Sequence, residues 1–196
     1  MAETMRGDQA LAWGALAAGV GVVSGYPGSP ATGVFDALLA RTAPGDLQIG
    51  WAPNEKVAME IAIGASLGGA RSLVVLKSVG MNIGLDPLAT MTYTGCHKGM
   101  VILLGDDPGA WGSQNEQDSR WLARVAEAPV VEPTSVEQAA ALMAQAFVWS
   151  ESCGTPIIVR ITRGLAVDRG EPQEPFAPPP PRGGFLRKRN RWISLP

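Results

Sequence analysis

Apolar residues form two kinds of segment along the first 165 positions of the chain. Longer segments carry apolar side chains on one helical face, and these predict amphipathic helices at 7–19, 31–42, 54–68 and 135–150. Shorter, continuously apolar segments predict strands at 20–24, 47–51, 72–77, 100–104 and 156–161. Ser72–Lys77 and Met100–Leu104 are so uniformly apolar that we expect both at the centre of a sheet covered on two faces.

The alternation of strands and helices predicts an α/β fold. We expect a three-layer, doubly wound sheet of about six mostly parallel strands, contained in residues 1–165. Beyond Gly164 the composition changes, and the proline run at 178–181 predicts an extended, stiff connection. Residues 166–196 are therefore expected to be a Pro-rich and basic linker or tail that leads to a module absent from this chain.

Charge and hydropathy exclude several classes of function. Residues 1–181 hold eleven basic and eighteen acidic residues, a net charge of −7, and the other five basic residues lie in the tail. Such a body lacks the basic field that attracts nucleic acid or anionic lipid. No apolar run approaches the ~18–20 residues that span a bilayer, and the acidic N-terminus does not resemble a signal peptide. We expect no nucleic-acid or membrane partner and a cytoplasmic location.

The sequence also disfavours a metal or nucleotide site within this chain. Two cysteines, Cys96 and Cys153, are too few for an iron–sulfur cluster or a four-thiolate zinc site. Gly105-Asp106-Asp107 resembles half of a Gly-Asp-Gly magnesium signature but lacks the asparagine that completes it. Neither a phosphate-binding P-loop nor a Gly-x-Gly-x-x-Gly turn is present. Any metal is therefore expected to belong to a partner.

Candidate chemistry gathers where strands end, because ligands of open α/β sheets collect at the carboxyl ends of strands. Polar segments follow four expected strands, at 26–30, 51–56, 78–82 and 106–120. Each segment also has a purely structural explanation. The structural explanation for Glu55 is that it complements a helix dipole, and that for Gly80 is that it eases a turn. The loop at 113–120 would simply be solvated, with its opposite charges paired.

Taken together, these segments resemble one known family. The motifs are Gly25-Tyr26-Pro27-Gly28-Ser29-Pro30, Asn54-Glu55-Lys56-Val57-Ala58, Lys77-Ser78-Val79-Gly80-Met81-Asn82, Asp106-Asp107-Pro108-Gly109 and Ser113-Gln114-Asn115-Glu116-Gln117-Asp118-Ser119-Arg120. In this order and spacing they are similar to the N-terminal domain of the indolepyruvate:ferredoxin oxidoreductase α subunit, over about residues 7–165.

The resemblance implies that this domain binds the pyrimidine ring of thiamine diphosphate. A second module of the same fold then binds the diphosphate and magnesium, and iron–sulfur clusters lie further on. Glu55 matches the catalytic glutamate that bonds the aminopyrimidine, and Asn54, Gly80 and Asn82 are expected beside the same cofactor. Ser29 and Arg120 match residues at the substrate carboxylate.

The leading hypothesis is the pyrimidine-binding domain or subunit of a thiamine diphosphate-dependent 2-oxoacid:ferredoxin oxidoreductase. It would oxidatively decarboxylate an aryl or other 2-oxoacid and be inactive without its partners, which are a diphosphate-binding module and an iron–sulfur or ferredoxin protein. A homodimer is also expected. Two alternatives stay open: the α chain of a two-chain thiamine-dependent 2-oxoacid decarboxylase, and a non-catalytic α/β assembly module.

Overall fold

A six-stranded, wholly parallel sheet forms the centre of the molecule in a computed structural model, which describes residues 4–180, 183–187 and 192. The strand order is β3-β2-β4-β5-β7-β6, and every neighbouring pair is parallel. The strands are β2 (Val22–Gly25), β3 (Gln48–Trp51), β4 (Ser72–Lys77), β5 (Met100–Asp106), β6 (Val130–Val131) and β7 (Ile157–Thr162). This topology confirms the expected α/β fold.

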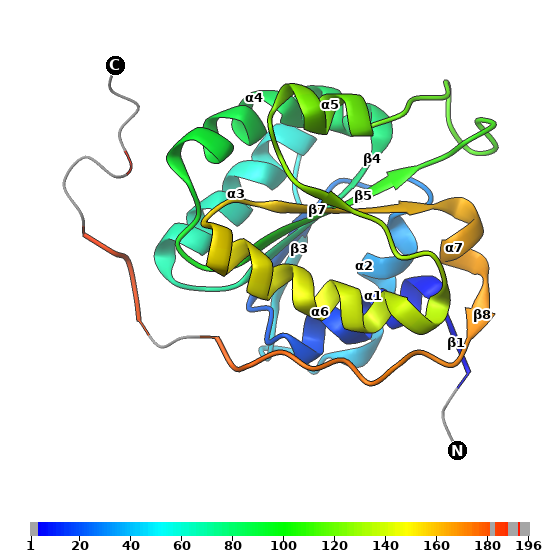
Figure 1. Cartoon of the computed structure of the whole chain (residues 1–196), viewed down its shortest axis with the longest axis horizontal. Coiled ribbons are helices and arrows are strands. Elements are labelled where there is room, and N and C mark those ends of the chain that lie inside the picture. Colours follow the sequence, from blue (N-terminus) through cyan, green and yellow to red (C-terminus); the bar gives the residue numbers. More distant parts are fainter. Residues whose placement is uncertain (1–3, 181–182, 188–191, 193–196) are drawn as a thin grey trace.

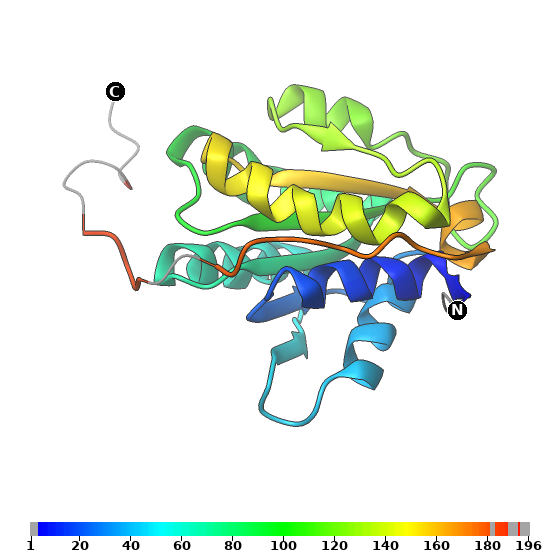
Figure 2. The same cartoon turned by 60° about the horizontal axis from the view of Figure 1, so that its bottom comes forward.

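Helices cover both faces of the sheet and complete the three layers (Figures 1 and 2). One face is covered by α1 (Gly7–Ala17), α2 (Thr32–Arg41) and α6 (Val136–Cys153). The other is covered by α3 (Glu55–Gly68), α4 (Ser78–Thr94) and α5 (Arg120–Val125). The chain is therefore doubly wound, with a separate hydrophobic core on each side of the sheet.

The central strands contribute alternate side chains to the two cores. Leu73 and Val75 of β4 are buried against α1, α2 and α6, whereas Val74 and Leu76 are buried against α3 and α4. Successive side chains of a strand point to opposite faces, so a strand between two helical layers must be apolar at every position. This explains why the uniformly apolar segments lie at the centre.

The expected strands and the four expected helices appear with their ends shifted by at most three residues. No helix was expected directly after Lys77, and the explanation of Gly80 as a turn residue is wrong, because 78–82 form the first turns of α4. Gly80, Gly84 and Pro87 lower the helix propensity of this segment. Burial of the α4 side chains Met81, Leu88 and Met91 against the sheet outweighs that cost.

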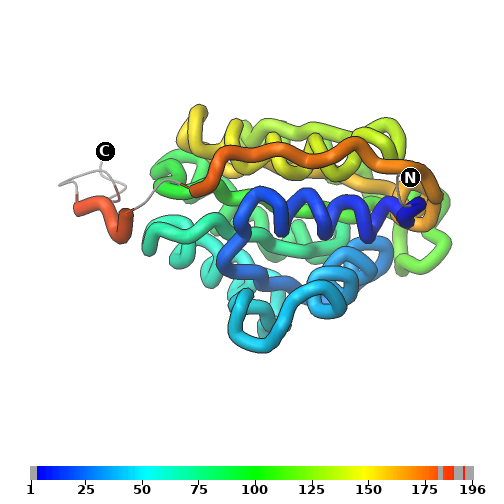
Figure 3. Tube along the Cα trace, turned by 90° about the horizontal axis from the view of Figure 1, so that it is seen from below, coloured from blue at the N-terminus to red at the C-terminus, as the bar shows by residue number. Residues whose placement is uncertain are grey.

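The first part of the Pro-rich segment packs on the domain. A short helix, α7 (Arg163–Val167), leads to β8 (Arg169–Gly170), which pairs antiparallel with β1 (Met5–Arg6). Residues 171–180 then run extended along α1 and α6 (Figure 3). The Gln173 amide donates to the Glu137 carbonyl at 2.8 Å, and Arg71 Nη1 donates to the Pro178 carbonyl at 2.9 Å. Of the tail's basic residues, Arg182, Lys188, Arg189 and Arg191 lie outside the described residues.

Candidate functional site

The carboxyl ends of β2 and β4 mark the point at which the winding of the sheet reverses. These strands are neighbours, with Gly25 in register with Val75, but the helices that follow them pack on opposite faces. Such a reversal opens a crevice outside the strand ends, where ligands of doubly wound sheets bind. The turn at 26–30 follows β2, and Lys77 is the last residue of β4. The topology thus brings the first and third predicted segments together.

Glu55 is placed at this edge by the start of α3. Asn54 caps the helix, since its side-chain oxygen accepts from the Val57 amide at 2.9 Å, and Glu55 is the first helical residue. The Glu55 side chain is half-buried, and within the described part of the chain its carboxylate forms no hydrogen bond or ion pair. A carboxylate in the first turn complements the helix dipole. Its oxygens remain available to a ligand.

Gly80, in the first turn of α4, lies directly against this carboxyl group. A β carbon at position 80 would stand 2.7 Å from both Cγ and Oε1 of Glu55. No side chain fits there without moving Glu55. The structure therefore brings together two of the residues predicted to lie beside the cofactor.

Asn82 is held by the long loop that follows β5. Its amide exchanges two hydrogen bonds with Gln117, at 3.0 and 2.9 Å, and Gln117 also donates to the Ser78 carbonyl at 3.2 Å. The loop at 107–119 is thus fastened to the first turns of α4. The Asn82 side chain is occupied by this contact, whereas the Glu55 carboxylate is not.

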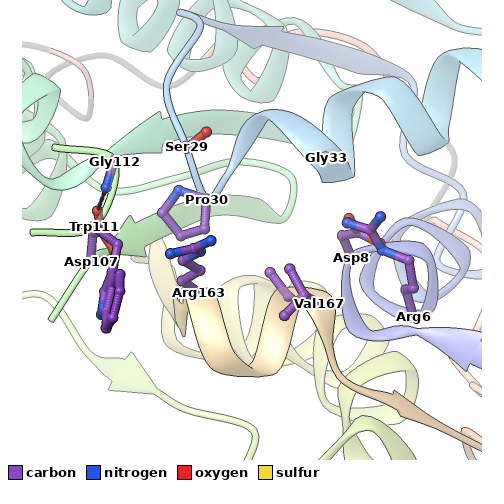
Figure 4. A pocket seen from close by; sticks show the side chains of 11 residues that line it. Arg6, Asp8, Ser29, Pro30, Gly33, Asp107, Trp111, Gly112, Arg163 and Val167 are labelled. Atoms are coloured by element: carbon purple, nitrogen blue, oxygen red, sulfur yellow. Dashed lines mark hydrogen bonds and ion pairs between the residues drawn. The ribbon is translucent and has the colours of Figure 1, made fainter. Parts of the chain in front are cut away.

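Ser29 lies at the rim of a pocket of about 260 Å³ (Figure 4). In Figure 4 the Ser29 side chain points away from Arg163. The pocket is formed by the starts of α1 and α2, the loop after β5, and α7, and is lined by Arg6, Asp8, Ser29, Pro30, Gly33, Asp107, Trp111, Gly112, Arg163, Ala166 and Val167.

Two groups in this pocket were given no site role from the sequence, although Asp107 lies in one of the polar segments that follow strands. Asp107 is buried, and the Gly112 amide donates to its Oδ2 at 2.6 Å. This bond, with smaller contributions from Ser113 and Arg163, lowers the pKa of the carboxyl although burial opposes the shift. The Arg163 guanidinium lies 5.6 Å from the centre of the Trp111 ring. Both residues directly follow an apolar strand, which is the signal that could have identified them.

Arg120 lies away from these groups, at the start of α5. Its guanidinium makes two hydrogen bonds to Asp118, both at 2.8 Å, and lies 3.7 Å from Glu132. The hydrogen bond from Arg120 lowers the pKa of Asp118 to about 2. The structure does not bring Arg120 to the pocket that Ser29 lines.

Two negative findings concern the described residues only. Among them no group of three or more His, Cys, Asp or Glu side chains is arranged to hold a metal ion. No helix in the described part of the chain combines the length and apolar character needed to cross a membrane.

Comparison with known proteins identifies several relatives and a structural neighbour. The IorA subunit of indolepyruvate oxidoreductase from Pyrococcus abyssi is 37% identical over 97% of this chain, and that from Archaeoglobus fulgidus is 43% identical over 79%. The chain spans 30% and 25% of the length of these two relatives. A 2-oxoglutarate:ferredoxin oxidoreductase from Magnetococcus marinus has the same fold, with a TM-score of 0.79 at 18% identity. The match covers 89% of this chain and 32% of that one.

A family model gives the assignment. Residues 13–174 match the family described as pyruvate flavodoxin/ferredoxin oxidoreductase, thiamine diphosphate-binding. This match covers most of the chain and confirms the resemblance carried by the five motifs. The chain belongs to the thiamine diphosphate-binding domain family of the pyruvate flavodoxin/ferredoxin oxidoreductases.

Proposed function

We propose that the chain is the pyrimidine-binding domain of a thiamine diphosphate-dependent 2-oxoacid:ferredoxin oxidoreductase whose substrate is indolepyruvate or another aryl 2-oxoacid. The observation that carries the proposal is the Glu55 carboxyl group, which stands at the carboxyl edge of the sheet beside Gly80 and has no partner among the described residues. The identity of 37% with an indolepyruvate oxidoreductase subunit supports the choice of substrate.

The residues around Glu55 suit an aminopyrimidine ring. A carboxyl group can share a proton with a ring nitrogen, and Gly80 leaves the backbone open beside it. When bound, thiamine diphosphate supplies the nucleophilic carbon and the electron sink for 2-oxoacid chemistry. The role of this chain is to hold the ring and to move a proton at the ring nitrogen through Glu55. Asn54 fixes the helix start that presents Glu55, and Asn82 fixes the loop over α4.

Ser29 and Arg120 are proposed to contact the carboxylate of the 2-oxoacid. Ser29 stands on the turn after β2 and lines the pocket of about 260 Å³. For Arg120 to serve this role, it must exchange its bonds to Asp118 for bonds to the substrate. We place the diphosphate, magnesium and iron–sulfur sites in partner modules, and we propose that the enzyme is cytoplasmic.

The test uses the complete α subunit with its partner subunit, thiamine diphosphate, magnesium and coenzyme A. The thiol of coenzyme A accepts the acyl group that remains after decarboxylation and oxidation, and coenzyme A is bound in the structure of the 2-oxoglutarate:ferredoxin oxidoreductase. The proposal predicts indolepyruvate-dependent reduction of ferredoxin that requires thiamine diphosphate. Release of the aldehyde without reduction of ferredoxin would instead identify a decarboxylase. An assembly that forms identically with and without thiamine diphosphate, and that does not convert the 2-oxoacid, would identify a non-catalytic module.

We further propose that the domain self-associates as a homodimer. Several large apolar side chains of α4 and α5 are exposed, among them Tyr93, Trp121 and Val125. A stable dimer interface buries more than about 1,000 Å², and such an interface would cover these exposed apolar side chains. Light scattering of the 196-residue chain at micromolar concentration should give twice its mass of 20.5 kDa. A single species of 20.5 kDa would contradict this proposal.

A further inference from the structure

Lys77 lies where β2 and β4 end side by side, and the proposed function gives it no role. It is the last residue of β4 and is half-buried. Its stem packs across Gly28 of the turn after β2, where an added β carbon would lie 2.5 Å from Lys77 Cδ and 2.7 Å from Cγ. Absence of a side chain at Gly28 thus lets the lysine lie across the strand reversal, next to Ser29.

The Lys77 ammonium group has no acceptor although it is half-buried, whereas Arg124 and Arg169, which also lack an acceptor among the described residues, are exposed to water. Within the described residues Lys77 makes no ion pair or hydrogen bond. Four other cations are paired with carboxylates at 2.7 to 2.8 Å: Lys56 with Asp86, Arg71 with Glu151, Arg120 with Asp118, and Arg160 with Asp106. A cation that is partly removed from water without an acceptor loses solvation free energy. A bound anion would compensate the ammonium group for this lost solvation free energy.

Stability of the domain does not explain a lysine at this position. Lys77 is also the N-cap residue of α4 and makes no capping hydrogen bond with its side chain. A positive charge at the amino end of a helix opposes the helix dipole, and Ser, Thr, Asp or Asn would cap it better. Local rules of this kind are broken mainly at functional sites.

We propose that Lys77 binds the carboxylate of the 2-oxoacid, which makes it a substrate-positioning residue in addition to Ser29 and Arg120. The inference rests on the proposed function. Lys77 contacts the turn that carries Ser29, and the residues that follow it lead within three positions to Gly80, which touches Glu55. Lys77 thus stands between the turn that carries Ser29 and the carboxyl group of Glu55, which is proposed to bind the cofactor. Its positive charge is unpaired, whereas that of Arg120 is paired with Asp118.

The experiment measures binding to the complete enzyme loaded with thiamine diphosphate and magnesium. The probes are indole-3-propanoate, which keeps the carboxylate and lacks the reactive ketone, and its neutral primary amide. Calorimetry compares the wild type with Lys77→Met and Lys77→Arg. Lys56→Met is the matched control, because Lys56 is an exposed lysine already paired with Asp86 at 2.8 Å. Lys77→Gln provides a second neutral variant should Lys77→Met fail to assemble.

The proposal predicts a specific loss of carboxylate binding. Lys77→Met should raise the Kd of indole-3-propanoate about 10- to 100-fold, the range of a hydrogen bond to a charged group. The Kd of the amide and the affinity for thiamine diphosphate should change less than about threefold. Lys77→Arg should recover part of the loss, and Lys56→Met should bind both probes as the wild type does. In steady state, the loss should appear mainly in KM for the 2-oxoacid.

Other results overturn the assignment of Lys77. Unchanged carboxylate binding removes Lys77 from the substrate site, and equal losses for the acid and the amide indicate a steric role. A loss of thiamine diphosphate affinity with normal carboxylate binding indicates that Lys77 contacts the cofactor's phosphates. An active wild-type enzyme with any of these results leaves the proposed function intact. A wild type that oxidises no 2-oxoacid overturns both.

Discussion

Gly80 lies so close to Glu55 that the structure has no room for a β carbon there: the added atom would stand 2.7 Å from Oε1 and from Cγ. Gly80→Ala should therefore push the carboxyl group out of position. Alanine favours a helix more than glycine does, by up to about 1 kcal/mol, and this gain opposes the cost of moving the Glu55 side chain, so the melting temperature should change little. We expect the complete enzyme to lose at least about tenfold in kcat, which steady-state kinetics would measure.

Gly64→Ala is the matched control on α3. A β carbon at Gly64 would meet no atom within 4 Å, so this variant should gain up to about 1 kcal/mol of stability and keep full activity. Should Gly80→Ala keep full activity too, the position of Glu55 does not matter for the reaction.

Asp106 stabilises the start of the long loop after β5. It is fully buried, and its Oδ2 accepts from Arg160 Nε at 2.7 Å and from the Ser119 amide at 3.0 Å. Asp106→Ala leaves the buried guanidinium short of a partner and should lower the free energy of unfolding by about 3–5 kcal/mol. Urea denaturation of the 196-residue chain measures this change.

Glu132→Gln provides the comparison, because Glu132 binds the same Arg160 at 2.6 Å but its side chain is 34% exposed. Loss of the Glu132 charge should lower the free energy of unfolding by no more than about 1 kcal/mol. Equal costs for the two variants would show that burial of Asp106 does not determine the strength of the pair.

Asp118 should titrate at low pH. Arg120 lowers the pKa of Asp118 to about 2 from an ordinary value of 3.8, so the pair stabilises the fold above pH 4. That stabilisation, under about 1 kcal/mol because the pair is exposed, is lost as the pH falls towards 2. Carboxyl NMR should return the pKa of Asp118 towards 3.8 in Arg120→Met. An unchanged pKa would mean that Arg120 is not bound to Asp118 in solution and is free for substrate.

The sequence predicted the fold wherever local pattern and burial agree. Ser72–Lys77 has the same bounds in the sequence interpretation and in the structure, because a strand buried on both faces is apolar throughout. The whole of α4 was missed for the opposite reason, since Gly80 and Pro87 oppose a helix locally and packing against the sheet decides. The two-residue strand β6 is too short to carry any pattern.

Part of the site depends on contacts that no local pattern contains. Asn54 and Glu55 could be placed because a cap and a first-turn acid are local features. The close approach of Gly80 to Glu55 and the packing of Lys77 across Gly28 join segments from different strands. Strand order determines which strand ends become neighbours, and it was not available before the structure.

The proposed role of Glu55 is to share a proton with the pyrimidine ring through its carboxyl group. Glu55→Gln keeps the size of the side chain and one acceptor but removes the proton that moves to the ring nitrogen. The test compares the wild type with Glu55→Gln. NMR measures the exchange rate of the thiazolium proton of thiamine diphosphate bound to each complete enzyme. We predict exchange slower by about 10²- to 10⁴-fold in the variant, with folding and assembly unchanged. Equal exchange rates in the two enzymes would contradict this role and leave Glu55 as a residue that only complements the dipole of α3.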